Sequence, residues 1–254
     1  MSHREFYESP EAVRYYASLN YLEAPENMFL KKITAMKQPV MLDIGIGAGR
    51  TTRYFAPLTA SYTGIDFSKS MIDACKKRFA DIPGIILQQG DARNMKEFPG
   101  DSFDIVLFSF NGLDTLSHED RLLALSEMKR VARPGGIILF SSHNLNIIGQ
   151  YFRFRLSLSP IGLLREIKRL VKIYSINKQS RKEAESAGYC TFYDGDAGNN
   201  ALHYFIRPEV QCRQLREAGF GKINVYSMLT GKTITSEEEM IRSKDNWLYY
   251  ECIK

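Results

Sequence analysis

Short apolar runs alternate with amphipathic segments over the middle of the chain. The runs are rich in Ile, Val, Leu and aromatic residues, and they have the length typical of buried β-strands. They span residues 40–43, 61–66, 84–92, 103–110 and 133–140. Between them, apolar positions recur at helical spacing over residues 50–57, 68–80 and 117–131. This alternation predicts an α/β fold with a doubly wound, mostly parallel sheet and helices on both of its faces.

The flanking segments add helices and two more strands. Further helices are predicted over residues 10–19, 25–37 and 208–218. Residues 145–188 predict a helical insertion that is broken near residues 159–162. Residues 222–229 and 247–253 predict the last two strands. With 254 residues, the chain is expected to form one elaborated domain around one core.

The clearest indication of a ligand-binding site lies directly after the first strand. Asp43 ends that strand, and Gly45, Gly47 and Gly49 follow at alternate positions before a helix. Glycines let the backbone turn sharply and let a ligand lie against it, and the helix N-terminus offers free N–H groups. A nicotinamide or flavin fingerprint would need its third glycine at position 50, which is Arg50. No Lys-Ser or Lys-Thr pair closes a phosphate-binding P-loop, so the pattern indicates a nucleotide-type cofactor of another kind.

Acids also end the second and third strands. Asp66 closes the strand at 61–66, and Asp91 stands at the end of the strand at 84–92. An acid after the second strand can accept both hydroxyl groups of an adenosine ribose. Each of the three acids could also be a turn or cap residue. Three of them on successive strand ends beside one glycine loop favour a cofactor site.

In this order, these landmarks resemble the class I S-adenosylmethionine-dependent methyltransferases that act on small molecules. The likeness covers residues 38–144 and includes the strand at 103–110 and the Pro134-Gly135-Gly136 turn. It implies a Rossmann-like, seven-stranded sheet with an antiparallel last strand. S-adenosylmethionine is the implied cofactor, and S-adenosylhomocysteine is the product.

The resemblance also implies how a single domain is divided. Its four parts are an N-terminal helical lid at 1–37, a cofactor-binding core at 38–144, a basic helical substrate lid at 145–205, and a C-terminal helix with the last two strands at 206–254.

Cofactor contacts are expected along the strand ends. Gly45, Gly47 and Gly49 would let the methionine part cross them, while Asp43 would order the loop or receive the ammonium group. Asp66 would bind the ribose. The adenine and the remaining contacts are assigned to Phe67, Met71, Asp91, Ala92 and Ser109.

Candidate acceptor-side residues follow the fourth and fifth strands. His143 is the first candidate for a general base, because it leaves a strand at its carboxyl end and histidine titrates near working pH. Asp114 is the second candidate, and a histidine that only hydrogen-bonds a loop or the substrate is the alternative. Asn111, Tyr7 and Tyr16 are expected to contact the acceptor, although the tyrosines could simply pack. A base is needed only where the acceptor loses a proton early, so transfer to oxygen or to nitrogen stays open.

The insertion is strongly basic. Between residues 145 and 188, nine basic residues face three glutamates, which accounts for the chain's whole net charge of +5. The basic residues are Arg153, Arg155, Arg165, Lys168, Arg169, Lys172, Lys178, Arg181 and Lys182. A positive lid would favour an anionic acceptor, such as a phosphate-linked small molecule, and a solvated helix face is the alternative.

Two rival functions use the same features. An RNA methyltransferase would explain the basic segment, but Ser109-Phe110-Asn111-Gly112 stands where a flipped-base motif would follow the fourth strand. A catalytically silent scaffold would keep the fold, and the intact glycine loop argues against it. No leader, spanning apolar run or metal-ligand spacing is visible, so a cytoplasmic enzyme with a small-molecule partner, no membrane and no metal is expected.

Overall fold

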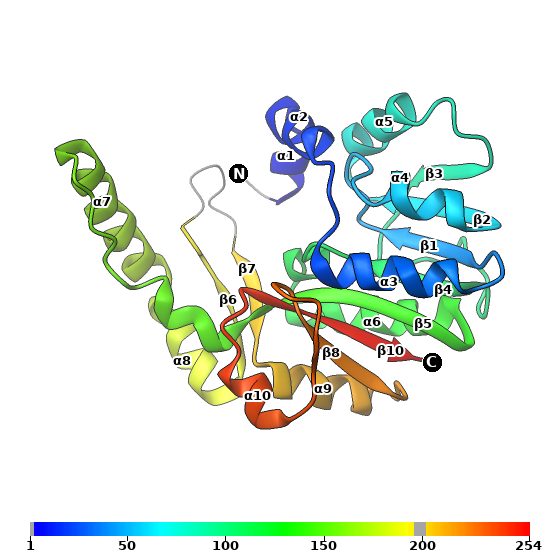
Figure 1. The fold of residues 1–254 in the computed structure, drawn as a ribbon. Helices are drawn as coiled ribbons and strands as arrows, with labels where there is room; N and C mark the ends of the chain where they lie inside the picture. Colours follow the sequence, from blue (N-terminus) through cyan, green and yellow to red (C-terminus); the bar gives the residue numbers. More distant parts are fainter. Residues whose placement is uncertain (1–2, 196–201) are drawn as a thin grey trace.

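One twisted β-sheet runs through the centre of the computed structural model, which describes residues 3–195 and 202–254 (Figure 1). Its main path consists of β3 (Ile85–Gln89), β2 (Ser61–Asp66), β1 (Val40–Ile44), β4 (Phe103–Phe108), β5 (Ala132–Asn144), β10 (Trp247–Ile253), β8 (Ile223–Ser227) and β9 (Thr233–Ile234). β1 to β5 pair in parallel, and β10 lies antiparallel between β5 and β8. The expected seven strands and their antiparallel last member are confirmed. The edge strand β9 was not predicted.

Both faces of the sheet are buried, and side chains alternate between them. Met41 and Leu107 pack on one face, while Leu42 and Val106 pack on the other, all four without solvent exposure. Burial of each such side chain contributes roughly 2 kcal/mol. The first face is covered by α3 (Ala24–Thr34), α4 (Thr52–Phe55) and α5 (Lys69–Arg78), and the second by α6 (His118–Val131) and α9 (Pro208–Glu217).

Helix ends follow local sequence signals. Ser68 and Ser117 begin α5 and α6, and each side chain accepts the N–H three residues on, at 3.2 and 3.1 Å. The helix expected over residues 50–57 is shorter, because α4 passes into a 3₁₀ turn at Ala56–Leu58. Pro57 lies in this turn and lacks the N–H that an α-helix interior requires.

The N-terminal segment docks beside the carboxyl edge of the sheet. It forms α1 (His3–Glu8), α2 (Pro10–Ser18) and then α3. The Glu8 carboxylate accepts the N–H groups of Lys69 and Ser70 at 2.9 and 3.1 Å. It therefore satisfies the first turn of α5 and attaches α1 there.

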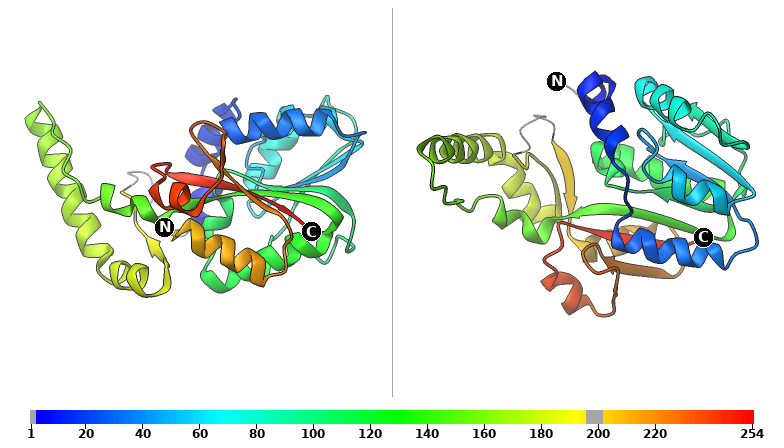
Figure 2. Two further views of the ribbon diagram at one scale, coloured as in Figure 1. Left: turned by 60° about the horizontal axis from the view of Figure 1, so that its bottom comes forward. Right: turned by 45° about the horizontal axis from the view of Figure 1, so that its top comes forward.

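The insertion is only partly helical, which corrects the helical segment expected over 145–205. The 3₁₀ turn η3 (Leu145–Gln150), α7 (Pro160–Ile176) and α8 (Lys178–Ala187) are followed by a hairpin of β6 (Tyr189–Phe192) and β7 (His203–Ile206). Aromatic and β-branched residues in both strands favour this hairpin. β7 pairs in parallel with the end of β5 and so extends the sheet. α7 projects away from the rest of the molecule in every view (Figures 1 and 2).

A last short helix, α10 (Glu237–Arg242), lies between β9 and β10. Among the described residues, no helix combines the length and the apolar character needed to cross a bilayer.

Candidate active site

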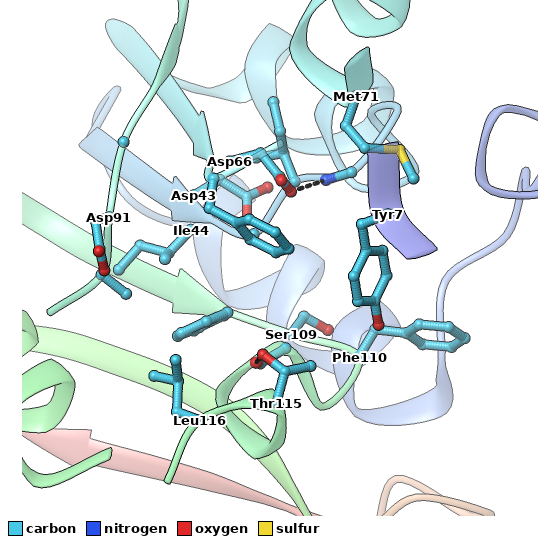
Figure 3. A pocket seen from close by; sticks show the side chains of 18 of the residues that line it. Tyr7, Asp43, Ile44, Asp66, Met71, Asp91, Ser109, Phe110, Thr115 and Leu116 are labelled. Atoms are coloured by element: carbon cyan, nitrogen blue, oxygen red, sulfur yellow. Dashed lines mark hydrogen bonds between the residues drawn. The ribbon is translucent and has the colours of Figure 1, made fainter. Parts of the chain in front are cut away.

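A cavity of about 650 Å³ opens at the carboxyl ends of β1 to β4 (Figure 3). This edge is where open α/β sheets bind ligands, and the volume suits a cofactor. Asp43 and Asp66 lie on neighbouring strands in its wall, with Asp91 on one side and Tyr7 and Met71 on the other.

Gly47 and Gly49, two of the three glycines after β1, require glycine for different reasons. All have positive φ, at 65° for Gly45, 53° for Gly47 and 86° for Gly49. A Cβ on Gly47 would meet nothing nearer than the Tyr16 ring at 3.9 Å, so a ligand can approach this backbone closely. A Cβ on Gly49 would instead collide with Phe79 of the neighbouring helix end, and Gly49 is not among the described residues that line the cavity. Its requirement for glycine comes from packing rather than from ligand contact.

Asp43 is buried and anchors the loop. Its Oδ2 accepts hydrogen bonds from the Thr51 hydroxyl at 2.6 Å and from the Tyr62 hydroxyl at 2.7 Å. Burial raises the pKa of Asp43 to about 7, against the lowering effect of these two bonds. The carboxyl group lies in the cavity wall and has capacity left for a further donor.

Asp66 stands at the end of β2 and connects two turns. Its Oδ2 accepts the Gly47 N–H and its Oδ1 accepts the Ser68 N–H, both at 2.8 Å. Burial raises the pKa of Asp66 to about 6, although both backbone bonds lower it. An ionised carboxylate accepts about four hydrogen bonds, so two sites remain for ligand hydroxyl groups.

Asp91 lies in the wall, but its carboxylate is already paired. Arg93 binds it through Nε at 2.9 Å and through a second guanidinium nitrogen at 2.7 Å, and Arg93 also reaches Asp120. The Arg93 hydrogen bonds hold the pKa of Asp91 below its usual value. The expected contact of Asp91 with adenine would therefore compete with this ion pair. The other adenine-side predictions that line the cavity are Phe67, Met71 and Ala92.

Sequence reasoning missed a buried polar cluster under the cavity. Arg50 forms a two-pronged pair with Glu26, with both distances at 2.6 Å. The hydroxyl groups of Ser109 and Tyr249 also bond Glu26. Although burial raises the pKa of Glu26, the Arg50 pairing dominates and lowers it. Ser109, expected to bind cofactor, lines the cavity but directs its hydroxyl into this cluster.

Asp114 and His143, the two candidates for the general base, form a pair. Asp114 Oδ2 lies 2.7 Å from His143 Nδ1 and also accepts the His143 backbone N–H at 2.6 Å. Its Oδ1 accepts hydrogen bonds from the Arg121 guanidinium group and from the Ser142 hydroxyl group. Burial would raise the pKa of Asp114, but Arg121 and His143 hold it below its usual value. Asp114 is thus an ionised acceptor that orients the imidazole.

The pair sits directly behind the wall of the cavity. The described lining residues include Phe110 and Gly112 but not Asn111, Asp114 or His143. Asn111 is joined in sequence to both of these lining residues, and its Nδ2 lies 3.3 Å from His143 Nε2. Phe110 and Asn111 have φ values of 55° and 59°, an uncommon conformation for consecutive residues other than glycine. Such strain is frequent at functional loops.

Aromatic rings enclose His143. Its ring stacks on Phe205 of β7 at 4.7 Å and lies near His203 at 5.6 Å. Trp247, its register partner on β10, makes an edge contact at 6.2 Å and also contacts Phe110 at 6.0 Å. The hairpin and the last strand therefore complete this side of the site.

Tyr7 and Tyr16 both line the cavity, as expected for contacts from the N-terminal helices. The Tyr7 ring lies 5.6 Å from the rings of both Tyr16 and Phe67. The two tyrosines thus adjoin the adenine-side residues more directly than they adjoin His143.

Comparisons with known proteins agree with this geometry. The methyltransferase domain family matches residues 41–136. Demethylmenaquinone methyltransferase of Staphylococcus aureus is 35% identical over 227 residues, which cover 85% of this chain and 81% of that protein.

Two solved structures share the fold. A methyltransferase from Mesorhizobium loti superposes with a TM-score of 0.59 at 16% identity, over 91% of this chain and 98% of that one. The glycopeptide N-methyltransferase MtfA, bound to S-adenosylhomocysteine, superposes with a TM-score of 0.58 at 18% identity, over 97% and 98%. The chain therefore belongs to the class I S-adenosylmethionine-dependent methyltransferases, and S-adenosylmethionine is its cofactor.

Proposed function

We propose that the protein methylates a planar, hydroxyl-bearing small molecule and that His143 removes the hydroxyl proton. The observation that supports this most is the Asp114–His143 pair, 2.7 Å apart and enclosed by Phe205 and Trp247. Flat aromatic walls favour a flat acceptor. A buried pair of this kind suits an acceptor that must lose a proton.

The cofactor would occupy the cavity with its amino-acid end at the glycine loop. Gly47 offers an open backbone there, Asp43 offers a carboxyl group, and Asp66 would accept the ribose hydroxyls. Phe67 and Met71 would flank the adenine. When bound, the cofactor supplies a methyl group that its sulfonium already activates, so the chain's main task is to position the acceptor and exclude water.

His143 would act through Nε2. Asp114 lies 2.7 Å from Nδ1, so we propose that Nδ1 carries the proton and that Nε2, which the Asn111 amide approaches to 3.3 Å, has the free lone pair. An acceptor hydroxyl that displaces this amide would give its proton to Nε2. The deprotonated oxygen would be the methyl acceptor, or a ring carbon that shares its negative charge and afterwards gives up its own proton. Asp114 is a positioning residue in this scheme.

Two segments would close the site. Arg4, Tyr7 and Tyr16 of the N-terminal helices line the cofactor cavity, and we propose that this segment acts as its lid. His203 and Phe205 of the β6–β7 hairpin flank His143, so the hairpin part of the insertion would cover the acceptor.

A turnover assay with an acceptor panel tests the proposal. The panel contains phenols and catechols, demethylmenaquinone in its reduced, hydroxyl-bearing form, phosphorylated sugars, amines and RNA. Demethylmenaquinone is included because the Staphylococcus aureus relative is named for it. Release of S-adenosylhomocysteine is expected only with planar hydroxyl compounds. Turnover with the phosphorylated sugars, amines or RNA alone would refute the proposed acceptor class.

His143→Ala is the matching variant. Loss of a general base should lower kcat by about 10²- to 10⁴-fold. His118→Gln is the control, because His118 bonds the Tyr204 hydroxyl at 2.7 Å and stacks on Tyr189 away from the cavity. Undiminished turnover in His143→Ala would reduce His143 to a loop residue.

A further inference from the structure

The outward face of α7 is apolar. Leu164, Ile167, Val171 and Tyr174 recur three or four residues apart, so they share one side of the helix. Val171 is 64% exposed, and Leu158, in the segment just before the helix, is fully exposed. Other large apolar side chains exposed in this region are Phe154, Leu156, Ile161, Leu163 and Ile176. So many exposed apolar side chains on and before a projecting helix indicate an interaction site.

The opposite side of α7 attaches the helix to the body. Ile173 is buried there, and Glu166 binds Arg169, which donates to the Tyr151 carbonyl at 2.9 Å. At the helix end, Asn177 exchanges two 2.8 Å hydrogen bonds with the Tyr193 backbone. These contacts use the side of α7 opposite to the exposed apolar residues, on a helix that projects from the rest of the molecule (Figures 1 and 2).

Basic side chains border the apolar face. Arg165, Lys168 and Lys172 follow one another at spacings of three and four residues, so they form a row along the helix. The Lys172 ammonium group also lies over the Tyr193 ring, 4.8 Å from its centre. Arg153 and Arg155 are exposed in the preceding segment. Residues 151–176, all of them described, contain one carboxylate, Glu166, which is buried against Arg169.

From this juxtaposition we infer that α7 and residues 154–158 bind the surface of an anionic phospholipid bilayer. The apolar side chains enter the boundary between headgroups and acyl chains, and the basic row contacts the negative headgroups. A helix that is apolar on its free side and basic along its edge is the pattern of interfacial anchors. The sequence-based expectation of no membrane partner considered only spanning segments, and this surface association is a different mode.

Charge distinguishes this occupant from a second copy of the chain. Pairing two α7 faces would bring two basic rows together, and the exposed face has no carboxylate to offset them. The inference is independent of the acceptor's identity. For a lipophilic acceptor it would add a place where enzyme and substrate meet.

Vesicle co-flotation of the full-length protein tests the inference. We expect binding to vesicles of mixed phosphatidylcholine and phosphatidylglycerol, weak binding to phosphatidylcholine alone, and weakening between about 0.1 M and about 1 M salt, which shortens the screening length. Leu164→Glu with Val171→Glu should lower the bound fraction about tenfold or more. Leu123→Glu is the control, an exposed leucine on α6.

A second pair of variants separates charge from apolar contact. Arg165→Glu with Lys168→Glu should abolish the preference for anionic vesicles. Lys31→Glu with Lys76→Glu makes the same charge change at exposed positions on other helices and should leave that preference intact. Unchanged affinity of every variant for S-adenosylmethionine, measured by calorimetry, confirms that each is folded.

Three outcomes would overturn the inference. The first is that the wild type does not float with anionic vesicles. The second is that it binds both vesicle types equally and independently of salt. The third is that it does not bind vesicles but forms a dimer in sedimentation, which the double variant Leu164→Glu with Val171→Glu dissociates. The last would show that a second copy covers the face.

Discussion

The cofactor side and the acceptor side of this enzyme are built in different ways. Around the cofactor cavity, functional groups come from strand ends and the turns directly after them, such as Asp66, whose carboxylate accepts the N–H groups of Gly47 and Ser68. Around His143, the groups come from β5, the turn after β4, the hairpin and β10. On the first side, most groups belong to a strand end or the turn that follows it, whereas the second side combines segments that are far apart in the chain. The difference predicts that the two sides can be damaged separately.

The largest effect is expected in the buried polar cluster under the cofactor cavity. Arg50→Leu leaves the fully buried Glu26 without its cation, although Ser109 and Tyr249 still bond it. Breaking a buried pair in this way costs about 3–5 kcal/mol of unfolding free energy. Denaturant titration measures the loss, with Arg53→Leu, an exposed arginine one turn along, as the control. Equal stability of the two variants would contradict the role assigned to the cluster.

Next in size is the contrast between two glycines of one loop. In Gly49→Ala the added methyl group meets Phe79 and Cys75 at positive φ, so stability should fall by roughly 2–3 kcal/mol. In Gly47→Ala the methyl group points into open space, so the strain costs stability roughly 1 kcal/mol while cofactor affinity falls more. Thermal unfolding and calorimetry together measure both effects. A larger loss of stability in Gly47→Ala would reverse the assignment.

The smallest effect is a pH dependence of cofactor binding. Since burial raises the pKa of Asp66 to about 6, the carboxyl group takes up a proton below that pH and loses its charge. Affinity should then fall by up to about tenfold per pH unit as the pH drops below about 6. The sign for folding is the opposite, because a raised carboxyl pKa favours the folded state at low pH and lowers stability as pH rises through about 6.

Asp66→Asn is the control for this pH dependence. The amide side chain that replaces the carboxyl group in this variant cannot ionise, so the change in affinity near pH 6 should disappear. Any pH dependence that remains should come from Asp43, whose pKa is about 7. An Asp66→Asn profile identical in shape to that of the wild type would assign the titration to another group.

Sequence patterns predicted the elements whose signal is local. The alternating runs predicted the strands β1 to β5 along the chain, the capping serines predicted the starts of α5 and α6, and the acids at strand ends predicted where the cavity lies. His143 and Asp114 were candidates because each follows a strand, but their 2.7 Å pairing depends on the parallel register of β4 and β5.

Two features carried no local signal. Glu26 meets Tyr249 across 223 positions of sequence, and no periodicity encodes such a contact. The sequence shows that the insertion is basic. The exposure of the apolar side chains on α7 is evident only from the structure, in which the helix projects from the molecule. The spacing of apolar residues predicts a helix with an apolar side, but it does not predict whether the rest of the protein covers that side.

Calorimetric titration of S-adenosylmethionine into the wild type, Asp66→Ala and His143→Ala tests the separation of the two sides most directly. Asp66→Ala should lose about 100-fold or more in affinity, because two hydroxyl groups lose a charged acceptor. His143→Ala should bind within about twofold of the wild type, because its partners are Asp114 and Asn111 rather than the cavity. Unchanged binding by Asp66→Ala, or an equal loss in both variants, would contradict the account.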